Sequence, residues 1–254
     1  MRVSRLYIAN DLTEGETINL NSERSHYLRS VIRLKKGYKL TVFNGDGREF
    51  QACVETTTRD GVWLLIGRGT VHDRESSLIT HLGLGISRGE RMDFAIQKAV
   101  EMGVNHITPL LTEHCVVRLE DDKKDARHQH WQKVIRSACE QCGRNRLPIL
   151  DAPLKLDDWL PQATGLRLLL DPDATANLGN LPRPETRVTL LSGPEGGFAE
   201  WERHTARQVG FTSVKLGPRI LRTETAVLAA LASVQTLWGD FNGLHQLDDI
   251  SPEN

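Results

Sequence analysis

The feature that most constrains this chain is the alternation of apolar strand patterns and helix patterns that begins near residue 78. "LITHLGLGI" reads as a strand, and it is followed directly by the helix pattern "SRGERMDFAIQKAVEMG". In that helix Ser87 and Glu90 have capping-box spacing, and Gly103 marks the C-terminal end. Strand–helix alternation is typical of a mostly parallel sheet covered on both faces, so we expect an α/β domain.

The same rhythm continues to residue 239. Four further strands are expected, at "VNHITPLL" (104–111), "LRLLLD" (166–171), "RVTLLSG" (187–193) and "SVKLG" (213–217). Three further helices are expected, at "HQHWQKVIRSACEQCG" (128–143), "AEWERHTARQVG" (199–210) and "TETAVLAALASVQTLWG" (223–239).

The first 72 residues follow a different pattern, with short strands separated by turns. In "KLTVFNGDGREFQACVE" two alternating segments flank Asn-Gly and Asp-Gly, which are strong hairpin signals. "GVWLLIGRG" supplies another strand, and one helix is expected from a cap at Ser22 through Ile32. We therefore expect a small barrel-like β domain over 1–72, the α/β domain over 73–243, and a polar tail over 244–254.

Composition and cysteine usage are those of an ordinary globular protein. The chain is 39% hydrophobic and 26% charged, and no N-terminal leader pattern is visible. Its longest weakly polar run, 226–238, is shorter than the ~20 residues that a membrane span needs. Four cysteines without a regular framework suit a reducing compartment, so we expect a cytoplasmic protein with no membrane partner.

Charge is unevenly distributed along the chain. The net charge is −1, yet residues 1–72 hold 11 Lys and Arg against 8 Asp and Glu. Within them, "RSHYLRSVIRLKKGYK" (24–39) has six basic residues, two tyrosines and no acidic residue. Basic side chains among aromatics suit contact with RNA, with a solvated helix face as the alternative. The RNA-binding candidates are Arg29, Arg33 and Lys36.

Several common site types find no support. Cys139 and Cys142 have no second cysteine pair to complete a zinc site, and they lie inside a predicted helix rather than at its start, so we expect packed thiols and no metal. The glycines of "GLGISRG" do not have the dinucleotide spacing, and there is no P-loop motif. No G-x-S-x-G elbow is present, and the histidines at 114, 128, 130 and 204 are scattered over different elements.

Two loops remain as a candidate ligand site. "LLSGPEGGF" (190–198) and "LGPRILRTETA" (216–226) each follow an apolar strand, and each contains Gly-Pro. Ligands of open α/β sheets bind at the carboxyl ends of strands. Either loop alone could be a tight turn, but two of them on what we expect to be neighbouring strands indicate a ligand site.

These stretches, together with "EHCVVR" and "WQKVIRSACEQCGRNRLP", resemble the bacterial 16S ribosomal RNA (uracil-N3)-methyltransferases of the SPOUT superfamily. "HYLRSVIRLKKG" is similar to the RNA-binding domain of that family. The resemblance runs from about residue 5 to residue 241, with Ser192 standing where the family has an apolar residue. It implies a PUA-like β-barrel, a C-terminal α/β domain with a trefoil knot, and a homodimer with its site at the subunit interface.

The resemblance also implies the ligand and the residues that hold it. The cofactor would be S-adenosylmethionine, with glycines letting the main chain approach it closely. By this resemblance the cofactor-binding residues are Leu169, Leu170, Leu191, Gly193, Glu195, Gly196, Gly197, Leu216, Gly217, Ile220 and Leu221.

The implied reaction is methyl transfer to uracil N3 of a uridine in small-subunit ribosomal RNA, on the assembled 30S subunit. Uracil N3 must lose its proton, so a base or a group that stabilises the negative charge is needed. Arg222 is the candidate for charge stabilisation, and Glu224 and Glu140 are candidate bases. A SPOUT enzyme that methylates a ribose 2′-hydroxyl and a non-catalytic RNA-binding adaptor with the same fold are the alternatives.

Overall fold

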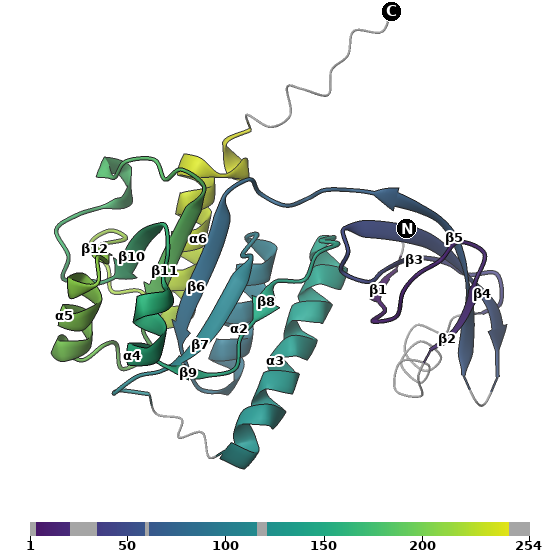
Figure 1. Ribbon diagram of the computed structural model, residues 1–254, viewed down its shortest axis with the longest axis horizontal. Coiled ribbons are helices and arrows are strands. Elements are labelled where there is room, and N and C mark those ends of the chain that lie inside the picture. The colour runs from purple at the N-terminus through teal and green to yellow at the C-terminus, as the bar shows by residue number, and fades with distance from the viewer. Residues whose placement is uncertain (1–3, 21–34, 59–60, 116–120, 244–254) are drawn as a thin grey trace, which may run out of the picture. The chain divides into compact units, whose positions relative to one another are not determined.

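The computed structural model describes residues 4–20, 35–58, 61–115 and 121–243 (Figure 1). They belong to two compact units, one made of Met1–Glu75 with Cys139–Leu147, the other of Ser76–Ala138 with Pro148–Asn254. The expected helix from Ser22 to Ile32 and the tail 244–254 lie outside the described residues. In the described part of the chain, no helix combines the length and the apolar character needed to cross a membrane.

The first unit holds a five-stranded sheet in the order β1-β3-β4-β5-β2. Its strands are β1 (Arg5–Tyr7), β2 (Thr17–Leu20), β3 (Lys39–Phe43), β4 (Arg48–Thr57) and β5 (Val62–Val71). The expected hairpin joins β3 to β4, and Gly45 and Gly47 take φ values of 96° and 98° at its turn. Alternate residues of these strands form one apolar cluster that includes Leu40, Val42 and Leu64. This sheet is the half-barrel of a PUA-type domain.

Residues 139–147 complete the first unit through polar contacts. The Glu140 carboxylate accepts the backbone N–H of Tyr7 at 2.9 Å. Arg144, which is 4% exposed, pairs with Glu75, and Asn145 accepts a hydrogen bond from Arg5. A buried guanidinium and a buried amide are costly unless paired, so these bonds hold the segment against β1 and the end of β5.

The second unit is built on a parallel sheet in the order β12-β10-β11-β6-β7-β8, with β9 also paired to β7. Its strands are β6 (Ile79–Gly85), β7 (His106–Leu111), β8 (Ile149–Leu150), β9 (Leu154–Lys155), β10 (Leu166–Leu170), β11 (Arg187–Ser192) and β12 (Thr212–Val214). Every strand pair described in this sheet is parallel. The α/β prediction is therefore confirmed, although the last strand is shorter than expected.

Helices cover both faces of this sheet (Figure 1). The α-helices are α2 (Gly89–Glu101), α3 (Asp121–Cys142), α4 (Leu156–Trp159), α5 (Glu200–Gln208) and α6 (Thr223–Trp238), and the short 3-10 turns are η1 (Leu160–Gln162), η2 (Leu178–Asn180) and η3 (Asp240–Asn242). Trp159 of α4 and Ala206 of α5 pack with Leu169 and Leu191 on one face. On the other face α2 packs against α6.

Gln235 fixes the position of α6. It is fully buried; its Oε1 accepts the Ser76 hydroxyl at 2.8 Å, and its Nε2 donates to the Met102 carbonyl at 3.1 Å. A buried amide is retained at low cost only when its donors and acceptors are satisfied. Through this residue α6 is tied to the end of α2 and to the entry of β6.

The predicted capping box at the start of α2 is wrong. The N-cap is Arg88, with no side-chain cap, and the Ser87 hydroxyl lies 3.5 Å from the Gly85 carbonyl instead. The Arg88 backbone N–H is accepted by Glu195, 107 positions further along the chain. A tertiary contact thus takes the place of the local cap. The expected end of the helix is confirmed, since Gly103 has a φ of 80°.

Cys139 and Cys142 close α3 rather than lying in its middle. Both are free thiols; Cys139 is fully buried and Cys142 is half-buried, as expected for packed thiols. Burial raises the pKa of Cys139 to about 12. Its thiolate population at neutral pH is therefore very small.

We expect alkylation to distinguish these two thiols. In the native protein at pH 8, only about one Cys139 thiol in 10⁴ is ionised, so iodoacetamide should leave Cys139 unmodified while Cys142 reacts. In urea both should react at similar rates, as peptide mass spectrometry would record. Equal labelling of the two thiols in the native protein would contradict the burial of Cys139.

Candidate active site

A cavity of about 540 Å³ lies at the carboxyl ends of three strands of the second unit. Most of its lining comes from the ends of β10, β11 and β12, from the segments that follow them and from the first turn of α6. This edge is where open α/β sheets bind ligands, and the volume falls in the range of about 300–1,000 Å³ typical of small-molecule sites. Both stretches singled out in the sequence line this one cavity.

The two loops do not come from neighbouring strands, which corrects the expectation. β10 lies between β11 and β12 and pairs with both. The end of β10 therefore forms the floor between the loops, where Leu170 and Asp171 line the cavity. Sequence neighbours among strands are not reliable spatial neighbours in a parallel sheet, because each crossover can skip a position.

The structure gives a different reason for the presence of glycine at each of positions 193, 196 and 197. A Cβ on Gly193 would lie 3.2 Å from the Phe198 ring, and one on Gly196 would lie 2.7 Å from the His114 Cβ. Gly197 has a φ of 66°, a conformation that side-chain-bearing residues rarely adopt, and its Cβ position is open. Gly193 and Gly196 therefore serve packing within the protein, and close approach to a ligand stays a prediction for Gly197.

A second close contact holds this loop against β6. A Cβ on Gly85 would lie 2.4 Å from both the nitrogen and the Cδ of Pro194. Only a glycine at the end of β6 lets the loop after β11 pack so closely. The "GLGISRG" glycines thus have a packing role: Gly83 lies against Trp159, where a Cβ would approach the ring to 2.4 Å.

Glu202 anchors the far end of the loop. It is 1% exposed, and one carboxylate oxygen accepts the Ala199 backbone N–H at 2.8 Å. Its other oxygen accepts the Glu113 backbone N–H at 2.8 Å. Charge-assisted bonds to backbone donors are the strong kind, so Glu202 fastens the start of α5 to the segment after β7.

Glu195 turns one carboxylate oxygen toward α2 and leaves the other unpaired. Its Oε1 accepts the Arg88 backbone N–H at 3.0 Å and lies 3.5 Å from Arg91. Burial by itself acts to raise the pKa of Glu195, but hydrogen bonds from backbone N–H groups outweigh it and hold the pKa below its usual value. Its Oε2 is buried without a hydrogen-bond partner among the described residues.

The first turn of α6 presents a cation and a carboxylate to the cavity. Arg222 is the N-cap of the helix and is exposed, and Glu224 lies in the first turn. The Glu224 Oε2 atom, like that of Glu195, is buried without a partner in the described part of the chain. Buried carboxylate oxygens are costly when unpaired, so both atoms are suited to receive a donor from a ligand.

The structure places the sequence-predicted residues in three groups. Eleven of them line the cavity: Leu170, Gly193, Glu195, Gly196, Gly197, Leu216, Gly217, Ile220, Leu221, Arg222 and Glu224. Leu169 and Leu191 are fully buried in the core beneath it. Glu140 and Lys36 belong to the first unit, where Glu140 bonds Tyr7 and Lys36 is exposed; Arg29 and Arg33 lie outside the described residues.

Comparison with known proteins agrees with this geometry. A model of the RNA methyltransferase domain matches residues 74–235, and a model of the RNA methyltransferase PUA domain matches residues 20–67. The ribosomal RNA small subunit methyltransferase E of Buchnera aphidicola is 37% identical over 243 residues, which is 95% of this chain and 99% of that protein. The chain belongs to the ribosomal RNA small subunit methyltransferase E family.

Two solved structures extend the comparison. The methyltransferase E of Neisseria gonorrhoeae, bound to S-adenosylmethionine, is 36% identical with a TM-score of 0.88 and covers 94% of this chain and 100% of that one. A Legionella pneumophila protein in complex with S-adenosylmethionine is 39% identical with a TM-score of 0.91 and the same coverage. The fold of these two proteins thus extends over most of this chain, with a PUA-type first unit and a SPOUT-type second unit.

Sequence reasoning missed several polar residues that line the cavity in this member of the methyltransferase E family. They are Arg91, Asp171, Arg203 and Lys215. Asp171 is 6% exposed and lies near the guanidinium groups of Arg203 and Arg207. The criterion used for the two loops, a position at the end of an apolar strand, could also have found Asp171, because Asp171 is the first polar residue after such a strand.

We expect Gly85→Ala to displace the 193–197 loop. The new methyl group would overlap Pro194, so the loop must move and the affinity for S-adenosylmethionine should fall at least about 10-fold, since a loss of 1.4 kcal/mol suffices. Isothermal titration calorimetry on the folded variant would measure this.

Gly83→Ala is the matched control, because it adds the same methyl group two residues earlier on the same strand. There the methyl group meets Trp159 instead of the loop. Gly83→Ala should lower the melting temperature and leave the affinity of the folded protein unchanged. If the two variants bound the cofactor equally well, the Gly85–Pro194 contact would not shape the cavity.

Proposed function

We propose that this protein transfers a methyl group from S-adenosylmethionine to N3 of a uracil in 16S ribosomal RNA. Family membership and the ligand held by two related structures support the cofactor. The observation that carries the proposal is that Arg222 and Glu224 both line the cavity from the first turn of α6, and that the Glu224 Oε2 atom is buried without a partner among the described residues.

The residues of the cavity fit the proposed cofactor. S-adenosylmethionine carries an ammonium group and a ribose diol, which are hydrogen-bond donors suited to the unpaired Oε2 atom of Glu195. The Cβ positions of Gly197 and Gly217 are open, and both residues have positive φ, so the main chain is accessible there. When bound, the cofactor supplies an electrophilic methyl group on a sulfonium sulfur.

The chemistry at uracil N3 requires that its proton be removed. We assign this role to Glu224: the N3 electron pair takes the methyl carbon, the electrons of the broken carbon–sulfur bond stay on sulfur, and the N3 proton passes to the Glu224 carboxylate. Arg222 stabilises the negative charge that spreads onto O2 and O4 as the proton leaves. Glu140 is the weaker candidate base because it is not among the residues that line the cavity.

The substrate in our proposal is small-subunit ribosomal RNA within the 30S subunit. The names of the relatives and the match to the PUA domain model over 20–67 support an RNA substrate. The basic stretch 24–39 falls within that match, and we assign RNA contact to its Arg29, Arg33 and Lys36. A division at residues 72/73 then separates an RNA-binding domain from the methyltransferase domain over 73–243.

One experiment can test both the methylated product and the roles of Arg222 and Glu224. A methyl group at N3 removes the Watson–Crick donor of uracil, so reverse transcriptase should stop at the modified base of 16S RNA from cells that express the protein. Deletion of the gene should abolish the stop. Arg222→Ala should restore it at a rate about 10²–10³-fold lower than wild type, and Glu224→Gln about 10²–10⁴-fold lower.

The control for these variants is Arg183→Ala, which removes an exposed arginine that does not line the cavity. It should restore the stop at the wild-type rate. A modification that reverse transcriptase reads through would favour ribose 2′-O-methylation over N3. Cofactor binding without any modification would favour an RNA-binding adaptor.

We also propose that the protein is a homodimer whose interface adjoins the cavity. Ile220 lines the cavity and is 87% exposed, which is unusual for a large apolar side chain beside a ligand site. Ile220→Glu should shift the protein from dimer to monomer in sedimentation velocity at micromolar concentration. The matched control is Ile149→Glu on β8, where the side chain is 61% exposed and should leave the dimer intact. A wild-type monomer would exclude the dimer.

A further inference from the structure

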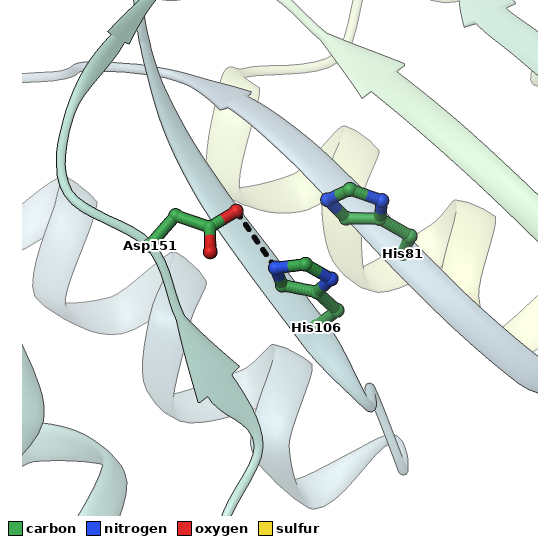
Figure 2. A group of neighbouring side chains, drawn as sticks. All are labelled: His81, His106 and Asp151. Atoms are coloured by element: carbon green, nitrogen blue, oxygen red, sulfur yellow. Dashed lines mark hydrogen bonds and ion pairs between the residues drawn. The ribbon is translucent and has the colours of Figure 1, made fainter. Parts of the chain in front are cut away.

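Three side chains from distant parts of the sequence meet on one face of the second sheet, away from the cavity. His81 is on β6, His106 begins β7, and Asp151 follows β8 (Figure 2). The strand register forces this meeting, since His81 pairs with His106, and His106 pairs with Ile149, two residues before Asp151. Residues paired across parallel strands point to the same face, so their side chains lie side by side.

The three side chains present donor atoms of the kind that zinc prefers. Each offers one ligand atom, and these atoms all lie within 4.8 Å of one another. The imidazole rings of His81 and His106 are stacked with centroids 3.9 Å apart, and both direct a nitrogen toward the Asp151 carboxylate (Figure 2). Two imidazoles and one carboxylate, with a fourth position left for water, are a known donor set for Zn²⁺.

Neighbouring polar groups hold the side chains of this cluster in place in the absence of an ion. The Thr108 hydroxyl donates to Asp151 Oδ2 at 2.6 Å and lies 2.8 Å from His81 Nε2. The Trp159 indole N–H points at the same His81 nitrogen from 3.4 Å. In metal sites the outer-shell hydrogen bonds go to the ring nitrogen that does not bind the ion, so an ion bound through His81 Nε2 would replace the contacts of Thr108 and Trp159 with this nitrogen.

Burial divides the cluster into a fixed part and an accessible part. His81 is 6% exposed and is enclosed by Trp159 and Thr108. The His106 and Asp151 side chains are 25% and 32% exposed, and they bond each other at 2.7 Å. An ion can therefore reach the cluster from the side of His106 and Asp151.

We propose that His81, His106 and Asp151 form a binding site for a divalent transition-metal ion, with Zn²⁺ as the ion of matching chemistry. Ligand atoms around a tetrahedral zinc lie about 3.4 Å apart for bonds of about 2.0–2.1 Å, so the cluster must contract on binding. The accessible His106 ring turns out of its parallel stack so that its lone pair converges with that of His81. The ion then links β6, β7 and the segment after β8 and stabilises the sheet.

This site is distinct from the proposed methyl-transfer site. None of its three ligands lines the cavity, which lies at the carboxyl ends of β10, β11 and β12. Metal binding is therefore expected to raise the melting temperature without changing the affinity for S-adenosylmethionine. In the described part of the chain this is the one cluster of three or more such ligands.

The test uses the full-length protein without an affinity tag, freed of metal by a chelator and dialysed. Zn²⁺ is titrated in competition with a chromophoric chelator, and we expect one ion per chain. His106→Ala and Asp151→Asn should weaken binding at least about 10-fold and remove the rise in melting temperature that Zn²⁺ causes in the wild type. Asp151→Asn keeps the shape of a part-exposed side chain, so it remains informative if His106→Ala does not fold.

Two control variants make the result specific. His130 and Asp93 form a surface pair at the same 2.7 Å distance, and no third ligand joins them among the described residues, so His130→Ala should retain zinc binding. Cys142→Ser should also retain it, and Co²⁺ in place of Zn²⁺ should give a spectrum without thiolate charge-transfer bands. The proposal is overturned if the wild type binds no Zn²⁺, if His106→Ala and Asp151→Asn bind it like the wild type, or if binding is lost in Cys142→Ser.

Discussion

The parallel pairing of β10 with both β11 and β12 is the constraint on which the candidate site depends. It brings the ends of three strands to one edge, although the strands are separated in the chain by 16 or more residues. The loops that follow β11 and β12 can then face each other across the end of β10. Without this strand order, Glu195 and Glu224 would not line the same cavity.

Buried polar side chains then hold the loops and helices that surround this edge. Glu202 fastens the end of the 193–197 loop with two backbone hydrogen bonds, and Gln235 fastens α6 from its far end. Each is nearly or fully buried, and each has its polar atoms paired within the second unit. Losing such a partner costs about 1–3 kcal/mol for the group left unpaired, so these residues fix the start of α5 and the C-terminal part of α6.

The sequence was sufficient to predict the parallel sheet, the β3–β4 hairpin and the two loops, because each of these leaves a local signal in hydrophobic period or in glycine and proline. Prediction from the sequence failed where residues far apart in the chain determine the local structure. The Arg88 N–H is satisfied by Glu195 rather than by a local cap, so the capping-box spacing of Ser87 and Glu90 was misleading. The packing role of the glycines at 83 and 85 leaves no local signal, because the residues they contact, Trp159 and Pro194, lie on other elements.

The His81–His106–Asp151 cluster is a further case in which local sequence patterns do not reveal a contact between distant residues. Its members are separated by 25 and 45 positions, and only the strand register makes them neighbours. The resemblance supplied the cofactor and the family, which pattern alone could not have done. The trefoil knot that the resemblance implies stays a prediction, since hydrophobic periodicity carries no information about how a chain threads.

The contacts at Gly85, Gly193 and Gly196 have a consequence for how this cavity can vary. Its shape is set by close packing at these positions: a Cβ would overlap Pro194 at Gly85 and the His114 Cβ at Gly196, and it would be tight against Phe198 at Gly193. A pocket walled by side chains can change its ligand by exchanging one residue for another of different size. In this protein such substitutions are hindered over much of the 193–197 loop. Mutations that change the ligand specificity are therefore confined to the rim of the cavity, where Leu216, Arg219 and Ile220 carry replaceable side chains.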